Sequence, residues 1–437
     1  MSADHLFVLL HGLWGKPAHM EMVKENLLKQ HPDVSVLVVS TYSGNLTYDG
    51  VSVCGNRVIE EMKEKIEDTK NDEGVVITKI SIIGYSLGGL IGRYVAGELF
   101  RSGFFDTIAP MNFTTFATPH LGTYIGTKGI TRSMFNMYGK KLLSQSGRDL
   151  FLGDDCILPK LSDPSECYYQ ALEKFKRISL YANIANDRSV PFHTAFIAVQ
   201  DPFRDLEHYR PYHLKGYSEP VIVDLSKPMK QLEVPYKRRW SSRDYVFTGM
   251  LVSIGPLVAF LAVIAITTAA QLSELRIRSL TDGKSPDNAV LSKRRTSTAH
   301  HDVGAGLSQN VVEGLLDNPV ADHLDSDNMT AADGSMYSTS DSEDLQKNVS
   351  YYSIDLLCEA LEEQERSAPV STSAAKISLE LLEEQYAMCE SLNKLPWNKY
   401  AVEIHSSLHS HAVIVNRNGK MTEGNTVLSH WAQRAVI

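Results

Sequence analysis

Cysteine is scarce in this chain, which has five among 437 residues. They are scattered rather than grouped, which argues against a disulfide framework and for a reducing compartment. Common metal and phosphate motifs are also missing: there is no His-Glu-x-x-His, no paired Cys-x-x-Cys and no phosphate-cradling lysine loop. We therefore expect neither a metal ion nor a cofactor at the site. The cysteines are Cys54, Cys156, Cys167, Cys358 and Cys389.

An excess of positive charge is absent as well, since the formal net charge is −9. Nucleic acid is therefore not an expected partner. The chain also lacks a cationic opening followed by an apolar stretch, and its first predicted strand begins almost at once. We expect a protein without a cleaved signal peptide that is not secreted. The length is ample for one large core with appendages.

The most informative pattern that is present covers residues 80–89, with the sequence ISIIGYSLGG. A β-branched run leads into Gly84-Tyr85-Ser86-Leu87-Gly88, and apolar residues then recur at helical spacing. This order of strand, tight turn and helix presents a serine hydroxyl where a base can reach its proton. An ordinary glycine-rich turn explains the five residues alone but not their context. We predict that Ser86 is a nucleophile.

A second loop is suited to binding an oxyanion. Residues 6–10 (LFVLL) read as a buried parallel strand, and His11-Gly12-Leu13-Trp14-Gly15 follows directly. A His-Gly-x loop in this place donates one N–H to the oxyanion, and the residue after the serine donates the other. A loop that merely ends the strand is the alternative, which the pairing with the Ser86 turn disfavours. We predict Leu13 and Leu87 as the donors and a structural role for His11.

The acid is expected beyond a strand that follows the serine in the chain. Residues 177–183 read as a core strand and lead into Asn186-Asp187-Arg188. A carboxylate just past the carboxyl end of a strand lies at the rim where parallel sheets place their sites. Asp187 is our prediction, and its alternative role is that of a solvent-facing turn residue. Asp201 and Asp205 are weaker rivals because neither directly ends a clear strand.

The base is harder to place, because many histidines follow Asp187. Residues 399–404 read as the last strand, and the loop beyond it contains His409 and His411. We predict His411 as the base, with His409 second, since a histidine in the loop after the last strand suits that role. His193 lies only six positions after Asp187 and is expected in the same loop as the acid.

These residues predict one mechanism. His411 takes the proton of Ser86, and Asp187 orients the imidazole and stabilises its charged form. Water then hydrolyses the acyl-enzyme.

One long apolar stretch interrupts the chain: no charged residue occurs from Val246 to Ala270. As a helix it would measure about 37 Å, more than the roughly 30 Å hydrocarbon core of a bilayer. A single crossing would separate Ser86 from His411. We therefore expect the stretch to return as a hairpin, to lie in the membrane interface, or to pack against the core. Basic residues on both flanks favour two cytosolic ends.

The chain then divides into four predicted parts. Residues 1–236 form the core with nucleophile and acid, and 237–280 form a membrane-associating segment. Residues 281–350 are poor in aromatics and rich in Ser, Asp and Asn, which is typical of a disordered linker. Residues 351–437 supply helices and the end of the core with the histidine. Within the core, the stretch 122–152 is either a lid or acyl-chain pocket, or ordinary helical packing.

Four motifs together resemble a fungal family of serine esterases and lipases. They are the loop at 11–15, the turn at 84–89, Thr118-Pro119-His120-Leu121-Gly122 and the stretch 186–191. The resemblance covers about the first 200 residues and the closing segment 411–415. It implies an α/β-hydrolase, with a mostly parallel sheet and helices on both faces. It also implies cleavage of acyl esters of glycerophospholipids or acylglycerols at a lipid-droplet or cytosolic membrane surface. It favours His411 over His409 and gives His120 a structural role.

Two other functions remain open at this point. The same triad serves an acyltransferase or a thioesterase, which differ in acceptor or leaving group. A catalytically idle hydrolase fold acting as a membrane tether is the third possibility.

Overall fold

The computed structural model of the chain describes residues 4–123, 139–233, 264, 266–280, 379, 381–407 and 409–437. The predicted linker at 281–350 and most of the apolar stretch lie outside these residues, as does part of the 122–152 insertion.

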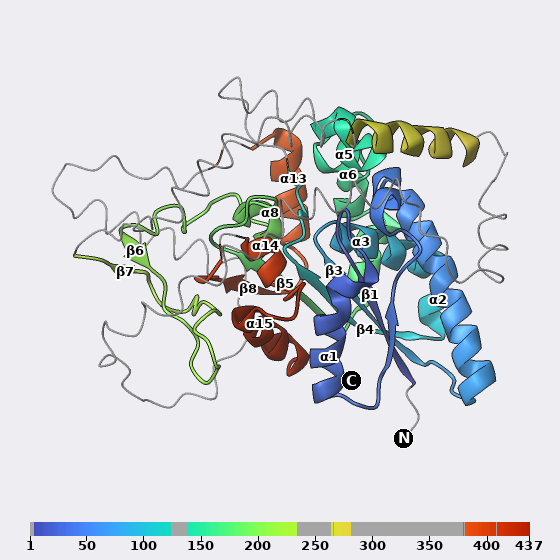
Figure 1. Ribbon diagram of the computed structural model, residues 1–437, viewed down its shortest axis with the longest axis horizontal. Coiled ribbons are helices and arrows are strands. Elements are labelled where there is room, and N and C mark those ends of the chain that lie inside the picture. The colour runs from blue at the N-terminus through green and yellow to red at the C-terminus, as the bar shows by residue number, and fades with distance from the viewer. Residues whose placement is uncertain are drawn as a thin grey trace.

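The centre of the molecule is a six-stranded sheet in the order β2-β1-β3-β4-β5-β8, in which every neighbouring pair is parallel (Figure 1). A separate antiparallel pair joins β6 to β7. The strands are β1 (His5–Leu10), β2 (Ser35–Val38), β3 (Lys79–Tyr85), β4 (Ala109–Phe116), β5 (Arg177–Asn183), β6 (Tyr209–Arg210), β7 (Lys230–Gln231) and β8 (Trp397–Val402).

Helices cover both faces of the sheet, because its strands bury side chains on both sides. In β1, Leu6 and Val8 belong to one core and Phe7 and Leu9 to the other. The first core is closed by α2, α3, α7, α8 and α13, and the second by α1, α14 and α15. The predicted architecture, a mostly parallel sheet with helices on both faces, is confirmed.

The helical elements of this scaffold are mostly short. The α-helices are α1 (Glu21–Gln30), α2 (Val51–Glu73), α3 (Leu87–Arg101), α5 (Ser144–Leu150), α6 (Leu158–Ser162), α7 (Cys167–Lys174), α8 (Phe192–Phe196), α13 (Glu383–Leu392), α14 (Ser410–Val413) and α15 (Thr422–Ala432). The 3-10 helices in the described part of the chain are η1 (Pro17–Met20), η2 (Gly44–Asp49) and η3 (Phe104–Asp106).

The strands predicted at 6–10, 177–183 and 399–404 agree with β1, β5 and β8 to within about two residues, and β3 runs on to Tyr85, into the predicted turn. The last strand ends at Val402 rather than at 404. It ends there because the next backbone N–H groups donate elsewhere than to β5. The N–H of Glu403 donates to the carbonyl of Val221 at 2.8 Å, and those of His405 and Ser406 donate to the carboxylate of Glu423 on α15, at 2.8 and 3.1 Å.

Parallel strands bring their carboxyl ends to one edge of the sheet, and the loops that follow them meet there. The loops after β1, β3, β4, β5 and β8 carry Leu13, Ser86, Thr118, Asp187 and His411, respectively. Residues distant in the sequence therefore converge at this edge.

The end of the apolar stretch belongs to a helix over residues 266–280, drawn in yellow beside α5 in Figure 1. Ala269 and Ala270 are buried against Tyr48 of η2. This end of the stretch thus packs against the core, which is one of the three predicted arrangements. Within the described residues no helix is both long and apolar enough to span a bilayer.

Two fully buried histidines make stability depend on pH. Burial lowers the pKa of His5 and of His11 from 6.5 to about 4. Below pH 6.5 the unfolded chain binds these protons while the folded chain does not. The free energy of unfolding is therefore expected to fall from pH 6.5 to 4, by up to about 1.4 kcal/mol per pH unit for each histidine. Urea unfolding at pH 7, 6 and 5 measures this slope.

The matched variant is His5→Gln, whose amide keeps a partner for the Ser81 hydroxyl that His5 contacts at 2.8 Å. It should reduce the slope by one proton. Asp201, whose pKa burial raises to about 6, acts in the opposite direction and is unchanged in the variant. An identical slope in both proteins would contradict the assignment to His5.

Candidate active site

Ser86 sits on a strained turn between β3 and α3. Its backbone has φ 54° and ψ −126°, in a region that side chains other than glycine rarely adopt. The Ser86 N–H donates to the carbonyl of Phe116 at 2.9 Å, and its carbonyl accepts from Thr118 Oγ1 at 2.9 Å. Both ends of the serine peptide are thus fixed by the neighbouring strand β4 and its loop, so the turn holds its strained shape.

The glycines of the turn are required by close backbone packing. A Cβ at Gly84 would collide with the backbone of Gly88 and Gly89. A Cβ at Gly88 would meet the carbonyl groups of Leu10 and His11, which end β1 and begin the next loop. The helix can therefore start immediately above the sheet only with glycine at these positions.

Three predicted residues meet at the edge of the sheet. Ser86 Oγ lies 3.0 Å from Nε2 of His411, and Nδ1 of His411 lies 2.9 Å from Oδ2 of Asp187. The serine follows β3, the carboxylate follows β5 and the histidine follows β8. This is a continuous hydrogen-bonded relay in which one nitrogen of the imidazole lies against a hydroxyl and the other against a carboxylate.

Asp187 is buried and amply hydrogen-bonded. Its Oδ1 accepts the N–H groups of Ser189 and Val190, at 3.0 and 2.8 Å, and its Oδ2 accepts Nδ2 of Asn183 at 2.9 Å. Burial alone would raise the pKa of Asp187, but the charge and hydrogen bond of His411 and the other donors outweigh it. The net effect lowers the pKa, which keeps the carboxylate ionised.

His411 is held in place through its backbone and through the neighbouring Ser410. The hydroxyl of Tyr85 donates to the backbone carbonyl of His411 at 2.9 Å, and the two rings lie 5.1 Å apart. The neighbouring Ser410 hydroxyl donates to the carbonyl of Ala185, at 2.7 Å, in the loop that carries the acid. The loops of base and acid are therefore joined directly.

The rival residues have other partners. His409 occupies the N-cap position of α14, and its N–H donates to Ser407 Oγ at 3.0 Å. Asp201 accepts the N–H of Phe203 at 3.0 Å, and Asp205 lies 2.8 Å from Nδ1 of His208. His193 is part of α8 rather than of the acid loop itself.

The loop after β1 lies against the nucleophile, since a Cβ on Gly12 would be 2.8 Å from Cβ of Ser86. Leu13 follows Gly12, and Leu87 opens α3, where an N–H has no acceptor within its own helix. Within the described part of the chain neither amide donates to a protein acceptor. Both predicted donors thus stand beside Ser86 with their N–H groups available.

His11 and His120 make contacts typical of structural histidines. The two ring nitrogens of His11 lie 3.1 Å from the Gly12 carbonyl and 3.3 Å from Ser43 Oγ. His120 is fully buried, with Nε2 2.9 Å from Thr115 Oγ1. Burial lowers the pKa of His120 well below 6.5, and the charges of Arg93 and Lys399 lower it further. Neither ring faces Ser86 in the way that His411 does.

One cluster among the described residues has the donor types of a metal site: His213, Glu403 and His405, whose ligand atoms lie within 4.8 Å of one another. However, Arg210 Nη1 is 2.8 Å from Glu403 Oε1, and His213 Nε2 is 3.0 Å from Oε2. The buried carboxylate already has a guanidinium partner, and a cation would compete with that charge. The cluster serves to tie the segment before β7 to the end of β8.

Sequence reasoning missed the residues that hold the triad. Asn183 is the last residue of the predicted strand, four positions before the acid. An amide side chain so close to Asp187 is the one sequence signal that points to a hydrogen-bond donor for the carboxylate. Tyr85 lies within the serine motif itself. Thr118 was noticed only as part of a family pattern. The partners of Tyr85 and Thr118 lie elsewhere in the sequence, so no local pattern reveals these two residues.

Comparison with known proteins finds a family model that matches part of the chain. Residues 1–199 match the family model described as "Putative serine esterase (DUF676)". The match agrees with the resemblance seen in the sequence, which covered about the same residues. The matched residues include Leu13, Ser86, Leu87 and Asp187, whereas His411 lies beyond them.

Curated relatives come from yeasts. The chain is 30% identical over 239 residues to a putative lipase named ROG1 of Saccharomyces cerevisiae, covering 52% of this chain and 33% of that protein. It is 34% identical over 239 residues to putative lipase C4A8.10 of Schizosaccharomyces pombe, covering 51% of this chain and 30% of that protein. The chain thus spans about a third of the length of these relatives.

Solved structures resemble the chain only distantly. They include carboxyl esterase 2 of Tuber melanosporum, with a TM-score of 0.28, 16% identity and coverage of 41% of this chain and 58% of that one. An extracellular α/β-hydrolase from Paenibacillus has a TM-score of 0.22, 17% identity and coverage of 30% and 50%. The parallel strand order β2-β1-β3-β4-β5-β8, with Ser86 between β3 and α3, agrees with the α/β-hydrolase fold expected from the sequence.

The packing of Gly12 on Ser86 generates a prediction. Gly12→Ala would push the loop of Leu13 away from the nucleophile, and loss of one oxyanion donor costs about 100-fold or more in kcat. We expect a loss of that size toward a short-chain p-nitrophenyl ester, with the variant still folded by circular dichroism.

The control is Gly74→Ala at the end of α2, where a Cβ has open space around it. It places alanine at a positive φ and so tests backbone strain alone. Full ester turnover by Gly12→Ala would show that this loop does not contribute to the site.

Proposed function

We propose that the protein is a serine hydrolase that cleaves carboxylic esters of glycerophospholipids or acylglycerols through an acyl-enzyme. The observation that carries the proposal is the relay from Ser86 through His411 to Asp187, with contacts of 3.0 and 2.9 Å. The serine esterase family model that matches residues 1–199 and the lipase names of the yeast relatives support it.

The geometry suits general-base attack. His411 Nε2 accepts the Ser86 proton as Oγ attacks the ester carbonyl, and Asp187 holds the Nδ1–H and stabilises the imidazolium. The amides of Leu13 and Leu87 donate to the oxyanion. His411 then gives its proton to the leaving alcohol. In the second half of the reaction His411 takes a proton from water, which attacks the acyl-enzyme. His411 then returns the proton to Ser86 Oγ, and a fatty acid is released.

We further propose that the enzyme acts at a lipid surface, either a lipid droplet or the cytosolic face of a membrane. Leu272 and Leu275 of the 266–280 helix, and Ile264 just before it, are exposed apolar residues. Their exposed fractions are 48%, 62% and 47%, respectively. In the sequence this helix directly continues the uncharged stretch that begins at Val246. An apolar helix face next to such a stretch suits the boundary of a lipid layer.

A panel of phospholipid and acylglycerol substrates tests the reaction. Wild type is expected to release fatty acid, while Ser86→Ala and His411→Ala lose about 10⁴-fold or more, because triad members act as one unit. His409→Ala is the matched control and should keep activity. His409 occupies the N-cap position of α14, and the contact with Ser86 Oγ is made by His411.

The products separate the alternatives. Acyl transfer to a second lipid would indicate a transferase, and preferred hydrolysis of an acyl thioester, which releases the thiol, would indicate a thioesterase. Full cellular function in Ser86→Ala would indicate an idle tether. Loss of activity in His409→Ala with retention in His411→Ala would overturn the base. Presenting one lipid in vesicles and in detergent monomers tests the surface: equal rates, unaffected by Leu275→Gln, would contradict surface action.

A further inference from the structure

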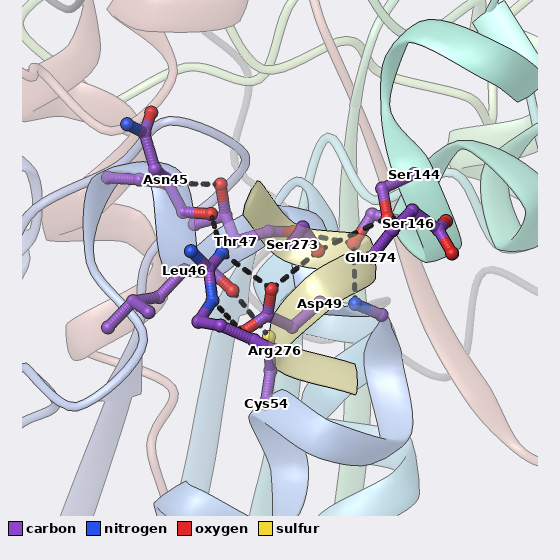
Figure 2. Close-up of polar contacts among 12 residues, drawn as sticks. Asn45, Leu46, Thr47, Asp49, Cys54, Ser144, Ser146, Ser273, Glu274 and Arg276 are labelled. Carbon is purple, nitrogen blue, oxygen red and sulfur yellow. Dashed lines mark hydrogen bonds and ion pairs between the residues drawn. The ribbon is translucent and has the colours of Figure 1, made fainter. Parts of the chain in front are cut away.

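A second buried carboxylate lies outside the triad, at the end of η2. The side chain of Asp49 is fully buried, with both oxygens engaged. Arg276 grips it with two nitrogens, Nη2 at 2.7 Å and Nε at 3.2 Å, and Ser273 donates its hydroxyl at 2.6 Å (Figure 2). Arg57 of α2 adds an ion pair at 2.8 Å. Two of these partners come from the 266–280 helix, which Asp49 therefore fixes to the core.

The same helix is fastened along its inner face. Glu274 accepts the hydroxyl of Ser144 at 3.0 Å and pairs with Arg148 of α5 at 2.9 Å. Figure 2 shows the helix lying between η2 and α5, with its polar side chains pointing toward both. Together with the buried alanines, these contacts define one docked position for the helix relative to η2.

η2 in turn holds the oxyanion loop. The backbone N–H of Trp14 donates to Thr47 Oγ1 at 3.1 Å, and its indole N–H donates to the hydroxyl of Tyr48 at 2.7 Å. The N–H of Gly44 donates to the carbonyl of Gly15 at 2.9 Å. Three hydrogen bonds thus connect the loop that contains Leu13 to the element that ends at Asp49.

Trp14 needs this support because its backbone is in the left-handed region, with φ 55°. A tryptophan adopts such a conformation only where surrounding contacts impose it. The Leu13 carbonyl and the Trp14 N–H form one peptide group, and the Leu13 N–H belongs to the peptide group just before it. Relaxation of Trp14 would therefore rotate the chain next to the oxyanion donor. The position of the Leu13 N–H therefore depends on Thr47 and Tyr48.

We propose that Asp49 is a positioning residue: by clamping the 266–280 helix onto η2 through Arg276 and Ser273, it fixes Trp14 and thereby the oxyanion donor Leu13. The inference rests on the proposed function, and it adds a link between the apolar stretch and the catalytic site. What holds the helix in its docked position also sets the efficiency of the chemical step.

Arg276→Met tests this link from the helix side and leaves the Asp49–Arg57 pair intact. With a soluble short-chain ester, we expect kcat to fall about tenfold, less than on complete loss of an oxyanion donor, and KM to stay within about twofold. Affinity for a trifluoromethyl ketone, whose adduct carries the oxyanion, should fall in parallel. Arg276→Lys should recover part of the loss, since it restores the charge but not the two-pronged contact.

Gln271→Ala is the matched control on the same helix, because Gln271 is exposed and belongs neither to the contacts with Asp49 nor to the apolar face. It should leave kcat unchanged on the soluble ester. Thermal melting of each variant separates local effects from unfolding, and Ser273→Ala provides a milder change if Arg276→Met proves unstable.

A double-mutant cycle with Tyr48→Phe tests the route. Tyr48→Phe removes the partner of the Trp14 indole, so its effect on kcat and that of Arg276→Met should overlap rather than add. Strict additivity in folded proteins, or an unchanged kcat in both Arg276→Met and Ser273→Ala, would overturn the proposal.

Covalent labelling by a fluorophosphonate distinguishes this failure from failure of the proposed function. If wild type is labelled at Ser86 and turns over esters while the helix variants match it, only the positioning role is wrong. If wild type neither labels nor hydrolyses any ester, the proposed function fails and the positioning role fails with it.

Discussion

The parallel order of the central sheet is the constraint on which the site depends. Because all six strands point the same way, the loops after them meet at one edge, and Ser86 can contact His411 across 325 residues of sequence. The strained turn at Ser86 then works only if β4 fixes its two peptide groups. Sheet topology and local strain are thus parts of one arrangement: the sheet delivers the loops, and their hydrogen bonds hold a serine in a conformation that it would otherwise leave.

Carboxylates organise the loops at this edge. Asp187 gathers two backbone N–H groups of its own loop as well as the imidazole. Glu423 gathers the N–H groups of His405 and Ser406, and Glu61 of α2 gathers those of Ser40 and Thr41 after β2. Each carboxylate replaces several water contacts of a loop with one rigid acceptor. The loops stay ordered without regular secondary structure, and the reacting groups need little rearrangement.

The sequence predicted what is local. Apolar runs marked the strands that bear the serine and the acid, and glycines marked the turn. The base was harder: its place after the last strand put His411 first and His409 second, and the family resemblance also favoured His411. Tyr85 and Asp49 could not be predicted in their roles, because each acts through a partner far away in the chain, whereas Asn183 contacts Asp187 only four residues later. The fold of the described residues was thus largely predictable, the triad partly so, and its supporting contacts not at all.

The most direct test of the account is to identify the residue that an alkyl fluorophosphonate modifies, by peptide mass spectrometry, and to follow the rate of modification. The account predicts a single adduct on Ser86 that forms rapidly in wild type and is slowed by orders of magnitude when His411 is replaced by alanine. An adduct on another residue, or a Ser86 adduct formed equally fast without His411, would contradict the claim that these residues form a working catalytic relay.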